Sequence, residues 1–495
     1  MNKRLSGVIT FFKTSPYLTF VAGVGLLFVL FCLFCIYKEN FILPVIVVSA
    51  FIAVYLSVVH TEKTLFLTAF MAPFSIELTN FLPEDINFSI PCELFLGILT
   101  VVLLLQYILE NRYPLVISKH KISILLILYL FWIFLTSITS SIPLVSFKFW
   151  IVKVVYIVPL YFFFAQILKK DIRKIVPFFL FYATALTIVV FITTYRYAQY
   201  KFVHNIIYWI VSPFYNDHTA YGAALAFFVP ILAIIPCIKT LSKSVRIYSL
   251  VLLAPILFGL YFSFSRAAWL SVIAVAMVAV LVLLKIKLRT FILAIVAVLA
   301  IFFAFENEIV NKLNRNTQDS SAGNFTAHLQ SISNVTSDDS NVERMNRWQS
   351  AFSMFKERPV FGWGPGTYQF NYAAFQSAKY KSGMTTNAGT AGNAHSEFFS
   401  VLSESGAIGL LILLSLLTLL ASTAIKTYKN ADNQELKLFS LMCLLALTSY
   451  FFHGLLNNFL DTEKLAIPVF AAMAVITVCH SDYKQQSENQ IIQEN

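Results

Sequence analysis

The sequence predicts an all-α, polytopic membrane protein with about 14 transmembrane helices. Of its 495 residues, 58% are hydrophobic and only 12% are charged, and the mean hydropathy is +0.74. About a quarter of the residues of a soluble domain are charged, whereas a helix needs about 20 mostly apolar residues to cross a membrane. A soluble globular fold is therefore excluded.

Apolar runs bounded by turn signals mark the predicted spans. The first run follows Met1–Arg4 as in a signal peptide, but it is too long for one and further spans follow, so we expect a retained anchor. The predicted spans are 17–37, 41–59, 64–81, 90–108, 122–139, 147–167, 175–195, 218–237, 248–264, 266–284, 290–306, 397–424, 437–459 and 465–480.

The basic residues of the loops predict the orientation. If the N-terminus is cytoplasmic, every strong basic cluster falls on the cytoplasmic side, as the positive-inside rule requires. The net charge of +11 resides largely in these clusters, so no nucleic-acid partner is expected. The clusters are Arg112/Lys119/Lys121, Lys169–Lys174, Lys239–Arg246, Lys285–Arg289, Lys426–Lys437 and Lys484.

The stretch from Leu250 to Lys285 is too long for one span and has basic residues on both flanks. It therefore predicts a hairpin whose tip, Ser263–Arg266, faces outward. This places Arg266 at the outer membrane boundary, where its guanidinium needs water, a carboxylate or an anionic ligand. The alternative is a snorkelling or salt-bridged arginine.

One long polar segment, residues 307–396, interrupts the apolar runs. In this prediction it separates the helices of residues 1–306 from the last three helices in residues 397–480, and residues 481–495 form a cytoplasmic tail. The alternation of spans puts the segment outside the cytoplasm. Its length and its content of Asn, Ser, Thr and Gly predict a partly helical extracytoplasmic loop domain.

A helix is predicted inside this loop from Glu343, because Trp348, Phe352 and Phe355 recur at helical spacing. Arg344 lies one turn before Trp348 on the same face. A cation near a helix start is unfavourable to the helix dipole unless something compensates. A bound anion, Glu343 or water could do so.

Ionisable side chains gather near the outer ends of the predicted spans, where burial in lipid would be costly. Interfacial solvation would explain some of them individually. As a set they predict a polar cavity that opens outward. The set comprises Glu93, Lys148, Lys153, Asp217, His218, Arg266, His395, Glu397, Asp461 and Glu463.

His395 follows a Gly- and Asn-rich run, residues 387–394, and precedes a long apolar helix. A helix N-terminus disfavours imidazolium and lowers the pKa of a histidine, which leaves a neutral ring able to accept a proton. The alternative is a capping or interface residue. No metal or other cofactor is expected, because the loop has no cluster with metal-ligand spacing and the Cys32–Cys35 pair lacks partners.

Three motifs in this order resemble the bacterial O-antigen ligase/polymerase superfamily. They are Ser265–Leu270 at the hairpin tip, Arg344-x-x-x-Trp348 followed by Pro359–Gly366, and His395–Gly409, which begins His-Ser-Glu-Phe-Phe. The resemblance covers the chain from about Asp217 onward. It implies a GT-C-like membrane glycosyltransferase of the bacterial inner membrane, with its active site facing the periplasm.

In that superfamily, arginines contact the diphosphate of an undecaprenyl-diphosphate-linked glycan and a histidine activates the acceptor hydroxyl without a metal. The resemblance thus implies that Arg266 and Arg344 clamp the diphosphate and that His395 is the base. Arg347 could replace Arg344 in the clamp, and Trp348 and His218 are expected to bind substrate beside them. Arginine forks suit phosphate oxygens and stabilise charge on a leaving diphosphate.

Three functions remain open at this point. A ligase would transfer the glycan to a sugar of the lipid A core, and a polymerase would transfer it to a growing glycan. The predicted helix count exceeds the twelve usual for ligases. A flippase or other transporter has a similar number of helices, but it usually carries midplane charges and repeated halves. Here the charges lie at one face and no repeat is visible.

Overall fold

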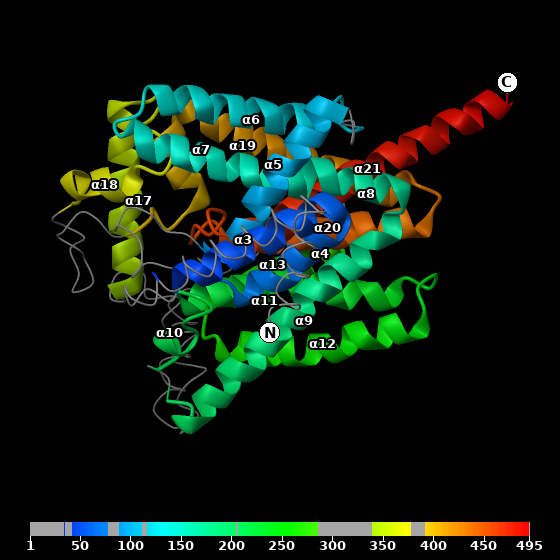
Figure 1. The fold of residues 1–495 in the computed structure, drawn as a ribbon, viewed down its shortest axis with the longest axis horizontal. Coiled ribbons are helices and arrows are strands. Elements are labelled where there is room, and N and C mark those ends of the chain that lie inside the picture. Colours follow the sequence, from blue (N-terminus) through cyan, green and yellow to red (C-terminus); the bar gives the residue numbers. More distant parts are fainter. Residues whose placement is uncertain are drawn as a thin grey trace, which may run out of the picture.

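The computed structural model describes Phe34 and residues 42–77, 89–110, 116–203, 206–285, 339–377 and 392–494, which form a bundle of helices (Figure 1). In chain order the elements are α3 (Ile42–Val59), α4 (Thr61–Met71), η1 (Ala72–Phe74), β1 (Ile76–Glu77), β2 (Ser89–Ile90), α5 (Cys92–Glu110), α6 (Lys121–Ile138), α7 (Pro143–Ile157), η2 (Val158–Phe163), α8 (Phe164–Lys170), η3 (Ile172–Lys174), α9 (Ile175–Gln199), α10 (Ile207–Ile210), α11 (His218–Ile234), η5 (Ile235–Cys237), α12 (Lys243–Phe262), α13 (Arg266–Leu283), α17 (Asp339–Glu357), α18 (Tyr368–Asn371), η6 (Tyr372–Phe375), α19 (Glu397–Asn430), α20 (Gln434–His453) and α21 (Glu463–Glu494).

Within this described part, ten helical stretches are long and apolar enough to cross a membrane. Each coincides with one of the predicted spans. They are Cys92–Glu110, Lys121–Ile138, Pro143–Lys170, Ile172–Gln199, His218–Cys237, Lys243–Phe262, Arg266–Leu283, Glu397–Asn430, Gln434–His453 and Glu463–Glu488. The chain is therefore an all-helical polytopic protein.

The remaining predicted spans have different outcomes. The span at 41–59 is occupied by α3, whereas those at 17–37, apart from Phe34, and 290–306 lie outside the described residues. The span at 64–81 is wrong, because α4 has only 11 residues and its axis covers about 16 Å. Pro73 lies in the 3-10 turn after α4, and Ile76–Glu77 then pairs with Ser89–Ile90 as an antiparallel strand.

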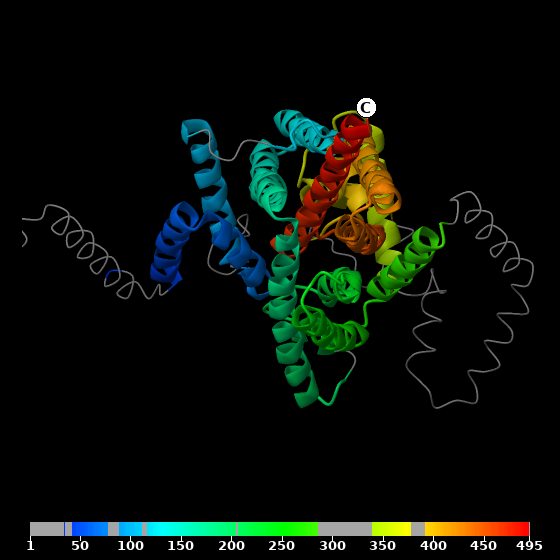
Figure 2. The same cartoon turned by 90° about the vertical axis from the view of Figure 1, so that its right-hand side faces the viewer.

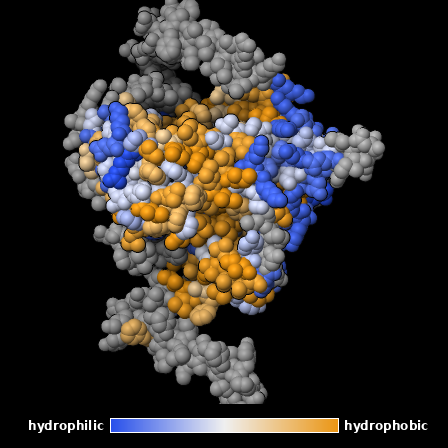
Figure 3. All heavy atoms as spheres, turned by 90° about the horizontal axis from the view of Figure 1, so that it is seen from above, coloured by the Kyte–Doolittle hydropathy of each residue, from blue (hydrophilic) through white to orange (hydrophobic). Residues whose placement is uncertain are grey.

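The two ends of the bundle differ in composition. We call the end that carries α17, α18 and the α12–α13 turn the loop face, on the left of Figure 1. At the opposite end, which we call the basic face, ion pairs join the five elements α4, α8, η3, α20 and α21: Lys169–Asp482, Arg173–Glu435 and Lys174–Glu62. In Figure 3, hydrophobic residues occupy the middle of the surface and hydrophilic residues gather at both ends. This distribution suits a helical bundle that crosses a membrane.

Two helices extend differently from the prediction. α21 continues through the predicted tail to Glu494, and its Asp482 is held by Lys169. The span predicted at 147–167 begins earlier, at Pro143, and includes a π-helical turn at Val158–Phe163. Pro159 has no N–H to donate within that turn, which accounts for the break in α-helical pairing.

The helix α19 is broken at Gly406, whose φ is +68°. The segment after α17 packs into this break: Pro359 O accepts the Ala407 N–H at 2.8 Å, and Trp363 N–H donates to Ser403 O at 3.0 Å. A Cβ at Gly406 would lie 2.0 Å from the Val360 oxygen, so only glycine fits there. The break therefore fixes α17 and its following turn against the start of α19.

Candidate active site

The α12–α13 turn places Arg266 as the first residue of α13. Ser265 caps this helix, because its Oγ accepts the Ala268 N–H at 3.3 Å, and Phe264 has a positive φ of +49°. A Cβ at Gly222 on α11 would lie 2.8 Å from the Ser265 Cβ. The absence of a side chain at Gly222 therefore lets the turn with Arg266 rest directly on the first turns of α11, as the predicted hairpin requires.

His218 begins α11 and is held by its neighbour Asp217. The His218 Nδ1 lies 2.8 Å from Asp217 Oδ1, and the same carboxylate caps the helix by accepting the Thr219 N–H at 3.0 Å. Burial would raise the pKa of Asp217, but the His218 contact and the Thr219 hydrogen bonds together hold it well below its usual range. Asp217 is thus a fixed negative charge at the loop face.

Arg347 on α17 is fully engaged within the protein and only 4% exposed. Its Nε donates to Glu343 Oε1 at 2.6 Å, and its Nη1 donates to Asn393 O at 3.3 Å. The guanidinium carbon lies 4.3 Å from the centre of the Tyr372 ring. A Cβ at Gly392 would collide with the same guanidinium. Arg347 therefore fastens the segment before α19 onto α17.

Arg344 lies one turn earlier on α17 and is less buried than Arg347. The helix begins at Asp339 rather than at Glu343, so Arg344 is beyond the first turn and the dipole argument for a bound anion does not apply. The charge of Arg344 acts on the rings of both His395 and His453. The charge of Arg344 is therefore felt both at the start of α19 and at the end of α20.

His395 precedes α19 in a left-handed conformation, with φ of +48°. Its N–H donates to Asn393 Oδ1 at 3.0 Å, and its carbonyl accepts the Trp348 Nε1–H at 3.2 Å. The helix cap is the next residue, Ser396, so the His395 side chain is not the cap. The Trp348 ring also stacks on Phe399, with 5.6 Å between ring centres.

Burial, followed by the charges of Arg344 and Arg347, lowers the pKa of His395 to about 4. The direction agrees with the sequence-based expectation, but the main cause is burial and not the helix dipole. Asp217 and a hydrogen bond to the Asn457 side chain oppose the shift. The ring is therefore neutral at pH 7 and able to accept a proton.

Residues 248–414 match the protein family described as O-antigen ligase. The chain carries an O-antigen ligase domain. This confirms the resemblance and implies glycosyltransferase activity on lipid-linked glycans. The matched stretch contains Arg266, Arg344, Arg347, Trp348 and His395, whereas His218 precedes it. The comparison with curated proteins finds no match.

Two residues beside the O-antigen ligase motifs were missed from the sequence. His453 ends α20 and is only 1% exposed, and neither of its ring nitrogens has a hydrogen-bond partner in the described part of the chain. Asn457 contacts the His395 ring. The predicted span 437–459 ran through both positions, although the Asn457–Asn458 pair is a polar interruption that could have ended it earlier.

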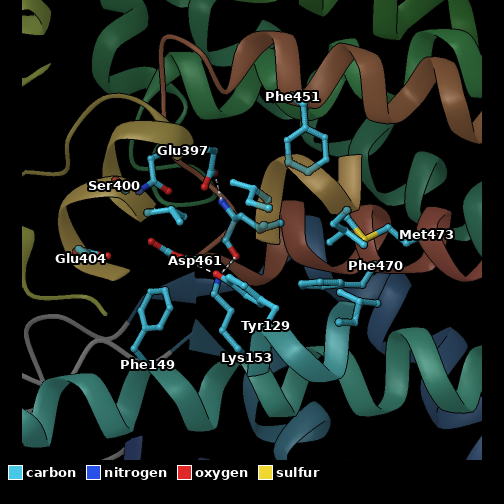
Figure 4. Close-up of a pocket in the computed structure, with 16 residues that line it drawn as sticks. Tyr129, Phe149, Lys153, Glu397, Ser400, Glu404, Phe451, Asp461, Phe470 and Met473 are labelled. Atoms are coloured by element: carbon cyan, nitrogen blue, oxygen red, sulfur yellow. Dashed lines mark hydrogen bonds and ion pairs between the residues drawn. The ribbon is translucent and has the colours of Figure 1, made fainter. Parts of the chain in front are cut away.

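A second polar group surrounds Glu397 at the start of α19 (Figure 4). Lys153 on α7 is 2% exposed, and its Nζ binds Asp461 Oδ1 and Leu460 O, both at 2.9 Å. Glu397 accepts the Phe459 and Leu460 N–H groups at 2.9 Å. These residues tie α7 and α19 to the α20–α21 turn.

Two adjoining cavities open among these groups. The outer cavity has a volume of about 270 Å³, and the inner one, of about 40 Å³, continues from it toward Tyr129 and Met473. Phe149, Lys153, Ser400, Glu404, Asn458 and Asp461 line both. Of the ionisable set predicted to surround a polar cavity, six residues line one or both: Glu93, Lys148, Lys153, Glu397, Asp461 and Glu463.

Proposed function

We propose that the protein transfers a glycan from undecaprenyl diphosphate to a hydroxyl of the lipid A core, at the periplasmic side of the bacterial inner membrane. The observation that carries this proposal is the electrostatic cluster in which Arg344 and the neutral His395 of the O-antigen ligase domain meet Asp217 from the start of α11. The loop face is the periplasmic face in this proposal, because the basic clusters lie at the opposite end.

The transfer is a displacement at the anomeric carbon of the donor. The acceptor oxygen forms a bond to that carbon while the bond to the diphosphate oxygen breaks, and the diphosphate leaves with the bonding electron pair. The acceptor proton passes to the His395 ring. Because one oxygen enters as the other leaves, the configuration is inverted. No metal or other cofactor takes part in this proposal.

Arg266 and Arg344 hold the diphosphate in this proposal. Arginine forks bind phosphate oxygens at two points and stabilise the charge that develops on the leaving group. Arg344 is the better candidate of the two arginines on α17, because it is less buried than Arg347 and therefore more accessible to a diphosphate. Arg347 and Trp348 then act as positioning residues for His395, and His218 contacts the glycan beside Asp217.

A transporter could use a broken helix such as α19, because unwound carbonyl groups can coordinate ions. In this protein those groups are already occupied. Trp363 N–H binds Ser403 O, Gly364 N–H binds Glu404 O at 2.9 Å, and Trp132 Nε1–H binds Ser405 O at 2.8 Å. The break therefore supports a structural role, which favours the transferase.

The test is transfer by the purified full-length protein in liposomes that contain an undecaprenyl-diphosphate-linked glycan. With lipid A core added, a ligase produces a glycan linked to lipid A. A polymerase, which shares the same motifs, instead produces longer undecaprenyl-linked glycan whether or not lipid A core is present. Absence of both products would contradict the transferase function.

A further inference from the structure

The outer cavity is built from elements that do not carry the arginines. Its polar lining comes from the β1–β2 hairpin, α5, α7, α18, the start of α19 and the α20–α21 turn. Arg266 begins α13, which packs against α11 and α20, and Arg344 is on α17. Figures 1 and 2 place α20 and α21 between α7 and α11. The cavity and the proposed diphosphate clamp thus flank the start of α19 from different sides.

Asn393 connects the outer cavity to His395. Its side chain lines the cavity, its Oδ1 accepts the His395 N–H at 3.0 Å, and its Nδ2 donates to Asn458 O at 3.1 Å. A displacement requires the entering oxygen to approach the anomeric carbon opposite the leaving diphosphate. A molecule in the outer cavity would reach His395 by way of Asn393, whereas Arg266 begins α13, an element that contributes no residue to the lining.

Asn458 has one buried polar atom that none of the described residues satisfies. The side chain is 7% exposed, its Nδ2 donates to Ser400 Oγ at 2.6 Å, and its Oδ1 has no hydrogen-bond partner among the described residues. A buried amide oxygen without a partner is costly, so it favours a ligand that donates a hydrogen bond. Asn458 lines both cavities.

The remaining lining favours a ligand with many hydroxyl groups. Carboxyl and amide side chains supply acceptors and Lys148 and Lys153 supply donors, while Phe149 and Tyr368 add aromatic surface. Its two lysines are outnumbered by five carboxyl side chains, so the lining is not the positively charged one that an anionic ligand needs: Glu77, Glu93, Glu404, Asp461 and Glu463. In the described chain, no three His, Cys, Asp or Glu side chains converge as metal ligands would.

We propose that the outer cavity binds the acceptor sugar as a neutral, hydroxyl-rich ring, with Asn458 Oδ1 accepting a hydrogen bond from one of its hydroxyls. The role of this sugar as the acceptor rests on the proposed function, whereas the binding of a sugar in the cavity does not. The volume of about 270 Å³ suits a single ring rather than a chain. The ring carries its reacting hydroxyl past Asn393 to His395.

The test is saturation-transfer NMR on the purified full-length protein without any donor, titrated with methyl glucoside, methyl galactoside and methyl N-acetylglucosaminide. At least one glycoside is expected to bind the wild type. Asn458→Leu should weaken its binding roughly five- to tenfold, the value of one neutral hydrogen bond. Asn371→Leu is the matched control, since the side-chain amide of Asn371 likewise donates hydrogen bonds within the protein but Asn371 lines neither cavity.

No saturation of any glycoside, or equal binding by wild type and Asn458→Leu, would overturn the proposal. Tighter binding of glucose 6-phosphate than of methyl glucoside would overturn the assignment of a neutral sugar. Because the assay contains no donor, failure of the transferase function would leave these results unchanged, so the two proposals fail separately.

Discussion

The indole of Trp348 donates a hydrogen bond to the main-chain carbonyl of His395, with 3.2 Å between Nε1 and O. This contact joins the helix that carries Arg344 to the residue that holds the neutral imidazole. Since His395 is in a left-handed conformation, its backbone needs such support to keep the ring in one position. The proposed clamp and the proposed base are therefore positioned by one side chain.

Trp348→Phe removes this hydrogen bond and keeps a ring that can stack on Phe399. We expect kcat to fall about tenfold, because a small displacement of a reacting group is costly, while the KM for the donor stays unchanged. Steady-state kinetics with varied donor measure both constants. A raised donor KM with normal kcat would show instead that Trp348 binds the substrate directly.

Arg266→Lys keeps the charge but replaces a two-point fork with a single ammonium group. We expect the transfer rate to fall by about tenfold or more, with an unchanged melting temperature, because Arg266 is only partly buried at the α12–α13 turn. Transfer assays and thermal unfolding in detergent measure the two effects. Transfer at the wild-type rate would identify Arg266 as a snorkelling residue.

Substitutions of Arg344 and Arg347 should differ in their effect on the stability of the protein, although the two residues lie on the same helix. Arg347→Met breaks the buried ion pair with Glu343 and should destabilise the protein by about 3–5 kcal/mol. Arg344→Met, at a less buried position, should lower the melting temperature less and impair transfer. The double variant Glu343→Leu/Arg347→Met, which removes both charges, should recover much of the stability. Equal destabilisation by both single variants would contradict this assignment.

The pH dependence of transfer should report the charge of Arg344. Burial and the charges of Arg344 and Arg347 lower the pKa of His395 to about 4, so the ring stays neutral down to about that pH. Activity should fall as the pH drops through this pKa, because a protonated ring cannot accept a proton. Arg344→Gln removes one charge that lowers the pKa, so the acidic limb of kcat/KM should move to higher pH.

Donor binding should raise the pKa of His395, as Arg344→Gln does. A diphosphate beside the arginines offsets their positive charge, which raises the pKa of His395 in the complex. The acidic limb of kcat, which reports the complex, should then lie at higher pH than that of kcat/KM, which reports the free enzyme. If the acidic limbs of kcat and kcat/KM coincide, and Arg344→Gln does not move them, the charge of the arginines does not set the pKa of His395.

The sequence predicted those parts of the fold that depend on local patterns. The α12–α13 turn followed from an apolar stretch with basic flanks, and α17 followed from its aromatic spacing. The start of α17 at Asp339 was missed because the first turn is polar and has no apolar period. The ten candidate spans in the described part of the chain were recognised because length and hydropathy determine them.

The parts that were not predicted depend on contacts between distant residues. Lys153 is buried because Asp461, 308 positions away, binds its ammonium group. The break at Gly406 exists because the backbone of Pro359 and Val360 packs against it. Hydrophobic periodicity does not predict such a contact between distant segments. That Asn458 Oδ1 has no hydrogen-bond partner among the described residues likewise depends on the packing of side chains distant in the sequence.

The most direct test of the central claim compares wild type with His395→Asn in single-turnover transfer from a purified undecaprenyl-diphosphate-linked glycan, with and without EDTA. Asparagine tolerates the left-handed backbone at this position, so the fold should be kept. If His395 is the base, the variant should bind the donor normally and transfer about two to four orders of magnitude more slowly, with EDTA having no effect on the wild type. Transfer by His395→Asn at the wild-type rate would contradict the account.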